Sequence, residues 1–225
     1  AWESVARKLA HEIKNPLTPI QLSIDRLREK YFSKINKNGE DFEKYLETIN
    51  RQIKDIENLV NEFSNFARMP RPIFKKIDIV DVINKSVNFV EISSKNKINI
   101  ISNEKKLIID GDREQLNRVF INLIKNSEEA FQDLVKKNPN FKGKIDIEII
   151  SNKEYIVVRL TDNGTGISDT KKVMTPYFTT KTKGTGLGLP IVSKIINEHS
   201  GDFLIKNKKD RNGINIEISF PKINA

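Results

Sequence analysis

A run of alternating glycines is the first part of this sequence that could do chemistry. Gly184, Gly186 and Gly188 precede a segment with the apolar spacing of a helix, and Pro190 falls in its expected first turn, where proline is tolerated. Exposed backbone N–H groups and the positive end of a helix dipole attract anions. The spacing fits neither a Walker loop nor a dinucleotide-binding fingerprint. We therefore predict a phosphate-binding loop, with a plain flexible loop as the alternative.

A second glycine pair follows an apolar strand pattern. Asp162 stands at the expected strand end, and Gly164 and Gly166 follow it, separated by one residue. Glycine permits close approaches that a side chain would block. The aspartate supplies a hydrogen-bond acceptor that suits the exocyclic amine of a purine. The same residues also form ordinary turns, so this motif alone leaves both interpretations open.

The segment between the two glycine clusters predicts a lid. Residues Pro176–Lys183 are basic and rich in hydroxyl groups, with a hydrophobic residue at Phe178. Lys181 and Lys183 would neutralise phosphate charge if this segment folded over a nucleotide.

Two asparagines upstream could bind a metal ion. Asn122 and Asn126 are four residues apart in a predicted helix and therefore lie on one face. Amide oxygens can complete a Mg²⁺ octahedron together with water and phosphate oxygens. Such a pair fits a solvated helix face equally well. The asparagine pair, the aspartate–glycine turn, the lid and the glycine loop in this order are hard to produce by chance, so together they predict a purine nucleotide site.

The chain has two histidines. His199 is expected to end a helix just before Ser200 and Gly201, which favours a structural cap. His11 lies roughly opposite the apolar seam of its helix at about 100° per residue, so we do not expect it in a core. Neutral imidazole is a nucleophile through one ring nitrogen while the other is oriented by an acceptor. An exposed histidine without a function is the alternative.

Two different regions must position these groups. Residues 1–69 predict two helices, because apolar residues recur at three-and-four spacing from Trp2 to Tyr31 and from Phe42 to Phe66. A polar loop over Ser33–Glu40 separates them. Two such helices cannot cover both seams alone, so we predict an antiparallel hairpin that forms a four-helix bundle in a homodimer.

Residues 70–76 are expected to be a linker, because Met69–Pro72 breaks the helical pattern. Residues 77–225 then mix strands and helices, which predicts a two-layer α/β sandwich and an α+β fold class for the whole chain. Asp112 and Gln115 predict a capping box at one helix start. The expected strands are Ile77–Val80, Lys97–Ser102, Leu107–Asp110, Lys144–Ser151, Tyr155–Leu160, Phe203–Asn207 and Ile214–Phe220, and the expected helices are Val82–Val90, Asp112–Lys136 and Gly186–His199.

Composition excludes several classes of protein. The net charge of +9 comes from 39 basic and 30 acidic residues, but these are interleaved along the chain, so nucleic-acid binding is not predicted. No stretch approaches the roughly 18–20 apolar residues of a membrane span. The absence of cysteine excludes disulfides and thiol catalysis and fits a reducing compartment. Because the first residue is Ala1, we expect a piece of a longer protein.

The nucleotide-site motifs resemble those of the histidine kinase catalytic domain, within the ATPase superfamily shared with gyrase, Hsp90 and MutL. Asn122–Asn126 resembles its N box, Asp162–Ile167 its G1 box, Phe178 its F box and Gly184–Leu189 its G2 box. The resemblance implies a two-layer Bergerat-type ATP-binding fold. It also implies that Asp162 binds adenine, that Asn126 and Asn122 bind Mg²⁺, and that the glycine loop binds the phosphates of ATP.

Four positions need separate comment: one distinguishes this chain from the hydrolytic relatives, and three depart from the pattern often found in the family. Asn122 stands where hydrolytic relatives carry a glutamate that activates water, and an amide cannot serve as that base. Ser127 and Glu129 replace the small and basic residues often found after the second asparagine, and Thr175 replaces an acidic residue often found before the lid proline. The implied nucleotide-site residues are Asn122, Asn126, Asp162, Gly164, Gly166, Phe178, Thr179, Thr180, Lys181, Lys183, Gly184, Thr185, Gly186, Leu187 and Gly188.

The segment His11–Leu17 closely resembles the H box of the dimerisation and phosphotransfer domain. The resemblance implies that His11 is the phosphoacceptor and Glu12 the general base. Asn15 matches the position where an amide or hydroxyl orients water in kinases that also dephosphorylate their regulator. Pro16 lacks the N–H that would bond the carbonyl of Glu12, so we expect a helix kink beside the acceptor.

Residues His11–Tyr31 and Asn61–Pro70 together resemble nitrogen-regulation sensor kinases of the NtrY type. That resemblance implies autophosphorylation of a histidine, phosphotransfer to an aspartate of an NtrX-like response regulator, and a full-length protein anchored in the inner membrane with this part in the cytoplasm. A hydrolytic or chaperone-type ATPase and a non-catalytic dimeric scaffold are the alternatives.

Overall fold

The computed structural model describes the backbone of residues 2–31, 39–67, 69–92, 94, 96–170, 172–175, 178–179, 186–208 and 212–223. Within these ranges, the side chains of residues 2–9, 11, 39, 62 and 65–67 lie outside the description. The chain forms two compact units. The helical unit lies within the residues up to Pro70, and the α/β unit begins at Arg71.

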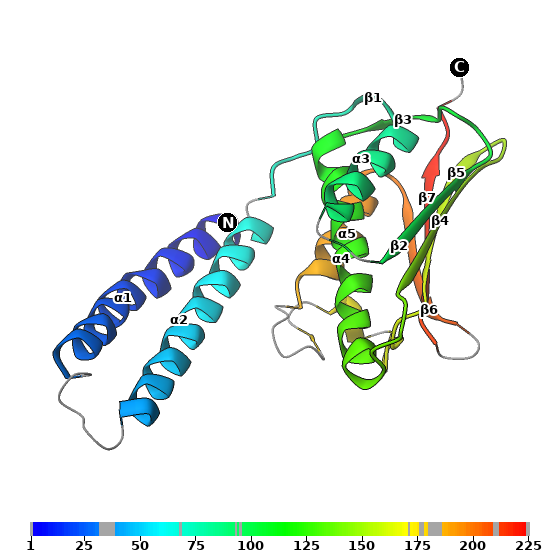
Figure 1. Cartoon of the computed structure of the whole chain (residues 1–225). Coiled ribbons are helices and arrows are strands. Elements are labelled where there is room, and N and C mark those ends of the chain that lie inside the picture. The colour runs from blue at the N-terminus through cyan, green and yellow to red at the C-terminus, as the bar shows by residue number, and fades with distance from the viewer. Residues whose placement is uncertain are drawn as a thin grey trace. The chain divides into compact units, whose positions relative to one another are not determined.

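The helical unit contains a hairpin of α1, Trp2–Tyr31, and α2, Gly39–Ala67 (Figure 1). The two helices run antiparallel, as the sequence predicted. Helix α1 continues through Pro16 and Pro19, and the bend predicted there stays a prediction. No helix in the described part of the chain is both long and apolar enough to cross a bilayer.

The hairpin is held by apolar residues at seven-residue spacing. Leu17 and Ile24 of α1 pack with Leu46 and Ile53 of α2 in one buried cluster, and Phe42 covers its edge. A seven-residue repeat keeps one face of each helix against its neighbour. A second set of large apolar side chains stays 41% to 69% exposed in the single chain: Ile20, Leu22, Leu27, Tyr31, Tyr45, Ile49, Ile56 and Leu59.

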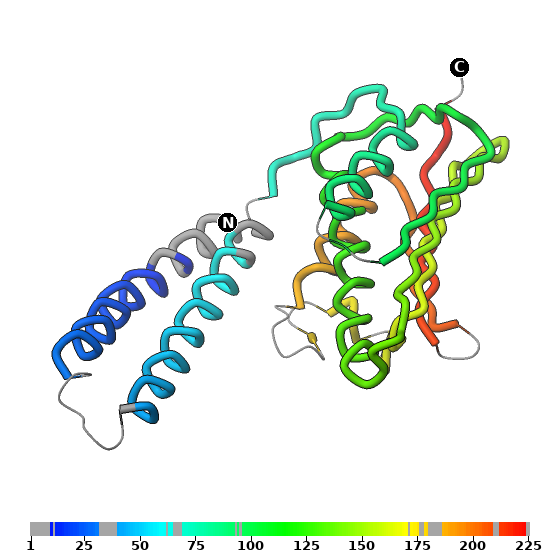
Figure 2. Tube along the Cα trace, viewed as in Figure 1, coloured from blue at the N-terminus to red at the C-terminus, as the bar shows by residue number. Residues whose placement is uncertain are grey.

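In the α/β unit, helices α3, α4 and α5 lie against one face of a sheet (Figure 1). Figure 2 traces the chain through this unit from cyan-green to red. Within the described residues, the larger sheet has the order β2–β4–β5–β7–β6, and β1 pairs with β3 in a separate antiparallel pair. Strands β2 and β4 are parallel, and the other neighbours are antiparallel. The bounds are β1 Lys75–Asp78, α3 Ile79–Glu91, β2 Lys97–Ser102, β3 Ile108–Gly111, α4 Arg113–Lys137, β4 Lys144–Ser151, β5 Tyr155–Asp162, η2 Lys172–Met174, α5 Gly188–Glu198, β6 Asp202–Asn207 and β7 Ile214–Pro221.

Strict alternation along the central strands builds the core between the sheet and the helices. Ile145, Ile147 and Ile149 of β4 point inward with every second residue of β5 and β7, and all are almost completely buried. Opposite them, α4 contributes Phe120 and Phe131. This two-layer arrangement and the helical hairpin confirm the predicted α+β class.

One predicted strand was wrong in part. Ile77–Val80 was expected as a strand, but β1 ends at Asp78 and α3 begins at Ile79. The Asp78 carboxylate caps this helix by accepting from the backbone N–H of Val80 at 3.1 Å, and it also accepts from Leu107 N–H at 3.0 Å. The β-branched residues that suggested a strand therefore continue into the buried face of a capped helix.

Candidate functional site

The carboxylate of Asp162 lies at the end of β5 and is only 3% exposed. Its Oδ1 accepts from the backbone N–H of Gly164 at 2.9 Å and from that of Ile214 at 3.1 Å. Its Oδ2 accepts from the hydroxyl of Ser127 at 2.7 Å. Donors from three chain segments therefore fix the direction of both carboxylate oxygens.

Glycines permit the chain to close around this carboxylate. A Cβ on Gly213 would lie 2.0 Å from the carbonyl oxygen of Asp162, and Gly213 has a φ of +100° that other residues rarely adopt. A Cβ on Gly164 would lie 2.9 Å from the Cβ of Ala130 on α4. The aspartate–glycine motif is thus a tight turn that presents a nearly buried acceptor, so the turn and the acceptor are compatible.

Two asparagines outside the predicted set hold the loop after β5. Asn163 accepts from Lys144 N–H at 2.8 Å and donates to the Lys142 carbonyl at 3.0 Å. Asn207, at the end of β6, accepts from Ile167 N–H at 2.7 Å and donates to its carbonyl at 2.6 Å. These amides position the turn at Gly166, which has a φ of 73°.

Helix α4 carries the predicted asparagine pair. Asn122 and Asn126 are both half-buried, one helical turn apart. A Cβ on Gly188, the first residue of α5, would lie 3.8 Å from Nδ2 of Asn126. The N-terminus of α5 therefore begins beside the second asparagine, where its backbone N–H groups and dipole favour an anion.

The oxygen donors at this site suit Mg²⁺ better than a metal ion whose ligands all come from the protein. The described residues contain no cluster of three or more acidic or histidine side chains that could hold a metal ion. Mg²⁺ usually keeps several waters and is bound by a few protein oxygens together with substrate phosphates. Neutral amide oxygens on one helix face beside an anion-binding helix end fit that pattern.

The glycine loop and the lid are described only in part. Gly186 has a φ of 69°, and Leu187 is fully buried. Helix α5 begins at Gly188 and not at Gly186 as expected, and Pro190 lies in its first turn, as predicted. Thr180, Lys181, Lys183, Gly184 and Thr185 lie outside the described residues.

The segment before the lid contains one short helical element. In η2, Lys172 N–H donates to the carboxylate of Asp169 at 3.1 Å. The backbone N–H of Phe178 donates to the Thr175 carbonyl at 3.2 Å, its side chain is half-buried, and Thr179 is exposed.

The predicted acceptor motif lies on α1. Glu12 and Asn15 are exposed, whereas Ala10 and Leu17 are buried on the face that packs against α2. The backbone of His11 belongs to α1, and its side chain lies outside the described residues. Its predicted position away from the hairpin core therefore stays a prediction.

His199 is a structural cap, as the sequence indicated. It follows α5, and Ser200 adopts a left-handed φ of 56° while Gly201 N–H bonds back to the Ile196 carbonyl, which closes the helix end. The imidazole is buried: Nδ1 lies 2.7 Å from the Ile195 carbonyl, and Nε2 accepts from Asp112 N–H at 2.9 Å. The proton must then sit on Nδ1.

Asp112 joins this cap to the start of α4. Burial alone would raise the pKa of Asp112. Hydrogen bonds from the backbone N–H groups of Ile73, Gln115 and Glu114 instead hold that pKa below its usual value. The N-cap at Asp112 is confirmed, but the Asp112 N–H donates to Nε2 of His199 and not to the Gln115 side chain, so the reciprocal bond of the predicted capping box is not formed. The cap also ties down the segment that enters the α/β unit.

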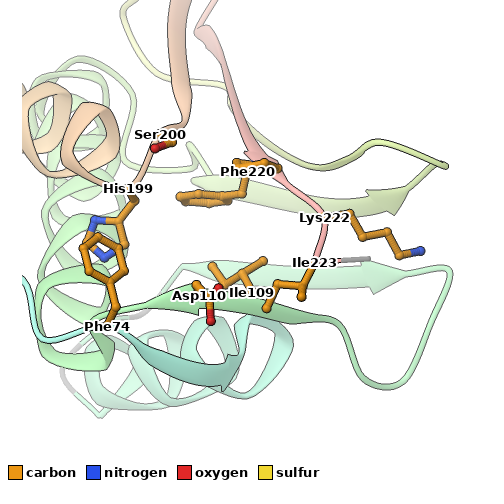
Figure 3. A pocket seen from close by; sticks show the side chains of 9 residues that line it. Phe74, Ile109, Asp110, His199, Ser200, Phe220, Lys222 and Ile223 are labelled. Atoms are coloured by element: carbon orange, nitrogen blue, oxygen red, sulfur yellow. The ribbon is translucent and has the colours of Figure 1, made fainter. Parts of the chain in front are cut away.

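A pocket of about 270 Å³ lies beside this junction (Figure 3). Phe74 packs against the His199 ring at 5.1 Å between centroids, and Phe220 and Lys222 line the other side. Because β5 and β7 are antiparallel and pair Tyr155 with Pro221, the pocket lies at the end of these strands opposite Asp162. The pocket is therefore distinct from the candidate site.

Two family models match this chain. The model described as Histidine kinase-, DNA gyrase B-, and HSP90-like ATPase matches residues 111–224. The model described as His Kinase A (phospho-acceptor) domain matches residues 1–72.

Curated relatives match nearly the whole chain. The nitrogen regulation protein NtrY of Azorhizobium caulinodans is 36% identical over 97% of this chain, and an NtrY-like sensor histidine kinase of Rickettsia prowazekii is 40% identical over 98%. The chain spans 28% and 36% of the length of these two proteins.

Solved structures share the fold. The catalytic domain of histidine kinase ThkA is 29% identical, with a TM-score of 0.58 over 67% of this chain and 96% of that domain. ThkA in complex with the response regulator protein TrrA has a TM-score of 0.67 over 98% of this chain and 61% of that one, at 24% identity.

Proposed function

This chain belongs to the histidine kinase family of ATPases, with a phospho-acceptor domain ahead of the ATPase domain, and on that premise we propose that it transfers the γ-phosphoryl group of ATP to His11. The observation that carries the proposal is the buried Asp162 carboxylate, held in place near the asparagine-bearing helix α4. The α5 N-terminus begins at that same helix, next to Asn126.

Each part of this site has a chemical role in the proposal. Oδ2 of Asp162 accepts from the exocyclic amine of adenine. Backbone N–H groups of the Gly184–Gly188 loop bind phosphate oxygens, and Lys181 and Lys183 of the lid neutralise their charge. Asn126 and Asn122 would hold Mg²⁺, which supplies charge neutralisation on the transferred phosphate.

The transfer step depends mainly on positioning. One imidazole nitrogen of His11 attacks the γ-phosphorus, the bond to the bridging oxygen breaks, and ADP leaves. Glu12 accepts the hydrogen bond from the N–H of the other nitrogen, raises the basicity of the ring and, as general base, takes up that proton as the N–P bond forms. Correct alignment of donor and acceptor can supply roughly 7–11 kcal/mol of the barrier. The side chain at position 122 supports transfer over hydrolysis, because an amide cannot activate water as a base.

We propose a homodimer as the working form. The exposed apolar residues of α1 and α2 form a second seam that a second hairpin would cover, and the match to the phospho-acceptor domain supports this arrangement. The proposed partner is the receiver domain of a response regulator, supported by the similarity to ThkA, which was solved with TrrA. The likeness to NtrY proteins favours an NtrX-like regulator.

The same likeness supports a membrane-anchored full-length protein with this part on the cytoplasmic side. Phosphatase activity toward the regulator is a further part of the proposal, because Asn15 is exposed one turn beyond His11. Replacing Asn15 with Ala should preserve autophosphorylation and slow the loss of phosphate from the regulator. Unchanged loss of phosphate would contradict this role.

Nucleotide binding tests the site directly. ATP with Mg²⁺ is titrated into the wild-type chain and into Asp162→Asn by calorimetry. Removing the charge and one acceptor oxygen should weaken binding about tenfold or more, since hydrogen bonds to charged groups contribute about 1.5–3 kcal/mol. Asp146→Asn is the matched control. Asp146 lies on β4 and bonds to Asn99 and Lys144 on the sheet face away from the helices. Equal affinities for all three chains would contradict the proposed site.

A further inference from the structure

One buried hydroxyl in the site belongs to Ser127, a residue outside the predicted nucleotide-site set. Ser127 follows Asn126 on α4, and its side chain is 0% exposed. It is also one of the positions at which the sequence departs from the pattern often found in the family. Its contacts in the folded chain indicate what this hydroxyl does.

Two acceptors lie within reach of its single proton. The Ser127 hydroxyl lies 2.7 Å from Oδ2 of Asp162 and 3.4 Å from the Leu123 carbonyl one helical turn earlier. Serine inside a helix commonly donates to that preceding carbonyl. The shorter bond to a carboxylate is also the stronger one, so the proton goes to Asp162.

Ser86 on α3 provides an internal comparison. It is buried to the same degree, yet its hydroxyl lies 2.9 Å from the carbonyl of Val82, the ordinary partner in a helix, and 3.2 Å from the side-chain oxygen of Asn117. In Ser127 the corresponding carbonyl, that of Leu123, is the more distant acceptor, and the hydroxyl donates to the Asp162 carboxylate at the end of β5. The orientation of Ser127 therefore serves Asp162 more than its own helix.

The two oxygens of Asp162 are used differently. Oδ1 accepts from the backbone N–H groups of Gly164 and Ile214, and a carboxylate oxygen accepts about two hydrogen bonds. Oδ2 accepts from Ser127, which leaves its second acceptor direction for a ligand. Rotation of the carboxylate would break the bonds at both oxygens, so the Ser127 hydroxyl helps to set the direction of the remaining acceptor.

We propose that Ser127 is a positioning residue for purine selection: its hydroxyl aims Oδ2 of Asp162 at the 6-amino group of adenine. This inference rests on the proposed role of Asp162 in adenine binding. An ionised carboxylate only accepts hydrogen bonds. Oδ2 in a fixed position therefore binds the 6-amino group of a purine and repels the oxygen of a 6-oxo purine. Without the Ser127 hydroxyl, only the two backbone bonds at Oδ1 hold the carboxylate, so the direction of Oδ2 is less firmly set and the preference for the amino group declines.

Two nucleotides separate positioning from a merely structural effect. Affinities for ATP and for purine riboside triphosphate, which lacks the 6-amino group, are measured on the full chain and on Ser127→Ala. We expect ATP affinity to decrease about five- to tenfold, the value of one hydrogen bond, and the analogue to change less than about twofold. An equal loss for both nucleotides, or no loss for ATP, would overturn the proposal.

Three further variants complete the test. Ser86→Ala removes a hydroxyl of equal burial from α3 and should leave both affinities unchanged. Ser127→Cys keeps a weaker donor and should lose an intermediate amount of affinity for ATP and none for the analogue. It provides the test if Ser127→Ala fails to fold. If Asp162→Asn binds ATP as the wild type does, the proposed function itself fails. If Asp162→Asn loses ATP while both Ser127 variants retain it, only the positioning role fails.

Discussion

The helical unit and the α/β unit cover their apolar side chains to different extents. In the α/β unit, the inward residues of β4, β5 and β7 and the facing side of α4 are almost completely buried by residues of the same unit. In the hairpin, α1 and α2 share one buried seam, while side chains such as Ile20, Ile49 and Ile56 remain more than 40% exposed. The α/β unit thus completes its own core, whereas the hairpin leaves a second set of apolar side chains exposed, which the proposed homodimer would cover.

Their functional groups differ in the same way. Asp162 is held by groups that come from α4, from the loop after β5 and from the start of β7. Glu12 and Asn15 lie exposed on a single helix. The candidate nucleotide site is therefore a product of tertiary structure, whereas the proposed acceptor motif is a local segment of one helix.

The largest expected effect follows from placing charges on the exposed seam. The double variant Ile49→Glu, Ile56→Glu should weaken dimerisation about a hundredfold or more, because each unpaired charge would be buried at a cost of several kcal/mol. Sedimentation equilibrium measures this. ATP affinity should stay unchanged, since the α/β unit covers its own core.

Lys54→Glu is the control for this variant. Lys54 is exposed on the same helix, and its reversal changes the net charge by the same amount as the two glutamates. If the double variant still dimerises as the wild type does, another surface joins the two copies. The exposed apolar residues of the hairpin would then not be the dimer interface.

A smaller effect is expected from removing single apolar side chains. Ile195→Ala, at a position that is 0% exposed, should destabilise the α/β unit by about 2–5 kcal/mol at any protein concentration. Ile56→Ala should cost less than about 0.5 kcal/mol if its side chain stays exposed, as surface substitutions do. If a second copy covers Ile56, the cost should be larger and should grow with protein concentration.

Urea unfolding at two protein concentrations distinguishes these cases. Trp2 is the single tryptophan of the chain, so its fluorescence reports the helical unit, while circular dichroism follows both units. Two results would contradict the comparison. One is a stability loss of the α/β unit in Ile195→Ala that depends on protein concentration, and the other is unfolding of the wild-type helical unit that does not depend on it.

The smallest effect concerns Asp112, whose carboxylate caps α4. Asp112→Ala should destabilise the α/β unit by about 1 kcal/mol near neutral pH, the usual value of an N-cap. Because folding lowers this pKa from its ordinary value of 3.8, the contribution is present above that value and is lost as the pH falls through the folded-state pKa. The stability difference from the wild type should therefore shrink below about pH 4.

Asp112→Asn is the matched variant for this prediction. It keeps a capping oxygen without a titrating charge, so its stability should change less at neutral pH and its deficit should also narrow in acid. A difference between Asp112→Ala and the wild type that stays constant down to pH 3 would show that the carboxylate charge contributes nothing.

Patterns with a strict period could be predicted from the sequence. Strands β2 and β4 have the expected bounds, because each alternates or runs apolar between clear turn signals. The hairpin followed from three-and-four spacing, and the α4 cap from Asp112. The start of α3 was missed because β-branched residues around Asp78 fit a strand as well as a buried helix face, and only the cap decides between them.

The candidate site could be predicted only where its chemistry is local. Asp162 and the glycines after it form a contiguous motif. The contacts of Ser127 and Ile214 with Asp162 join residues 35 and 52 positions apart, and Asn207 reaches Ile167 over 40 positions. No local pattern marks such residues, because their role exists only once the sheet and α4 have packed together.

The most direct test of the two-region account is incorporation of labelled phosphate from γ-labelled ATP and Mg²⁺. Wild type is compared with His11→Gln and Asn126→Asp in the full chain. With His11 as the acceptor and Asn126 in the ATP site, acid-labile, base-stable label should appear on the wild type alone. Label on His11→Gln, or release of free phosphate without any labelled protein, would contradict it.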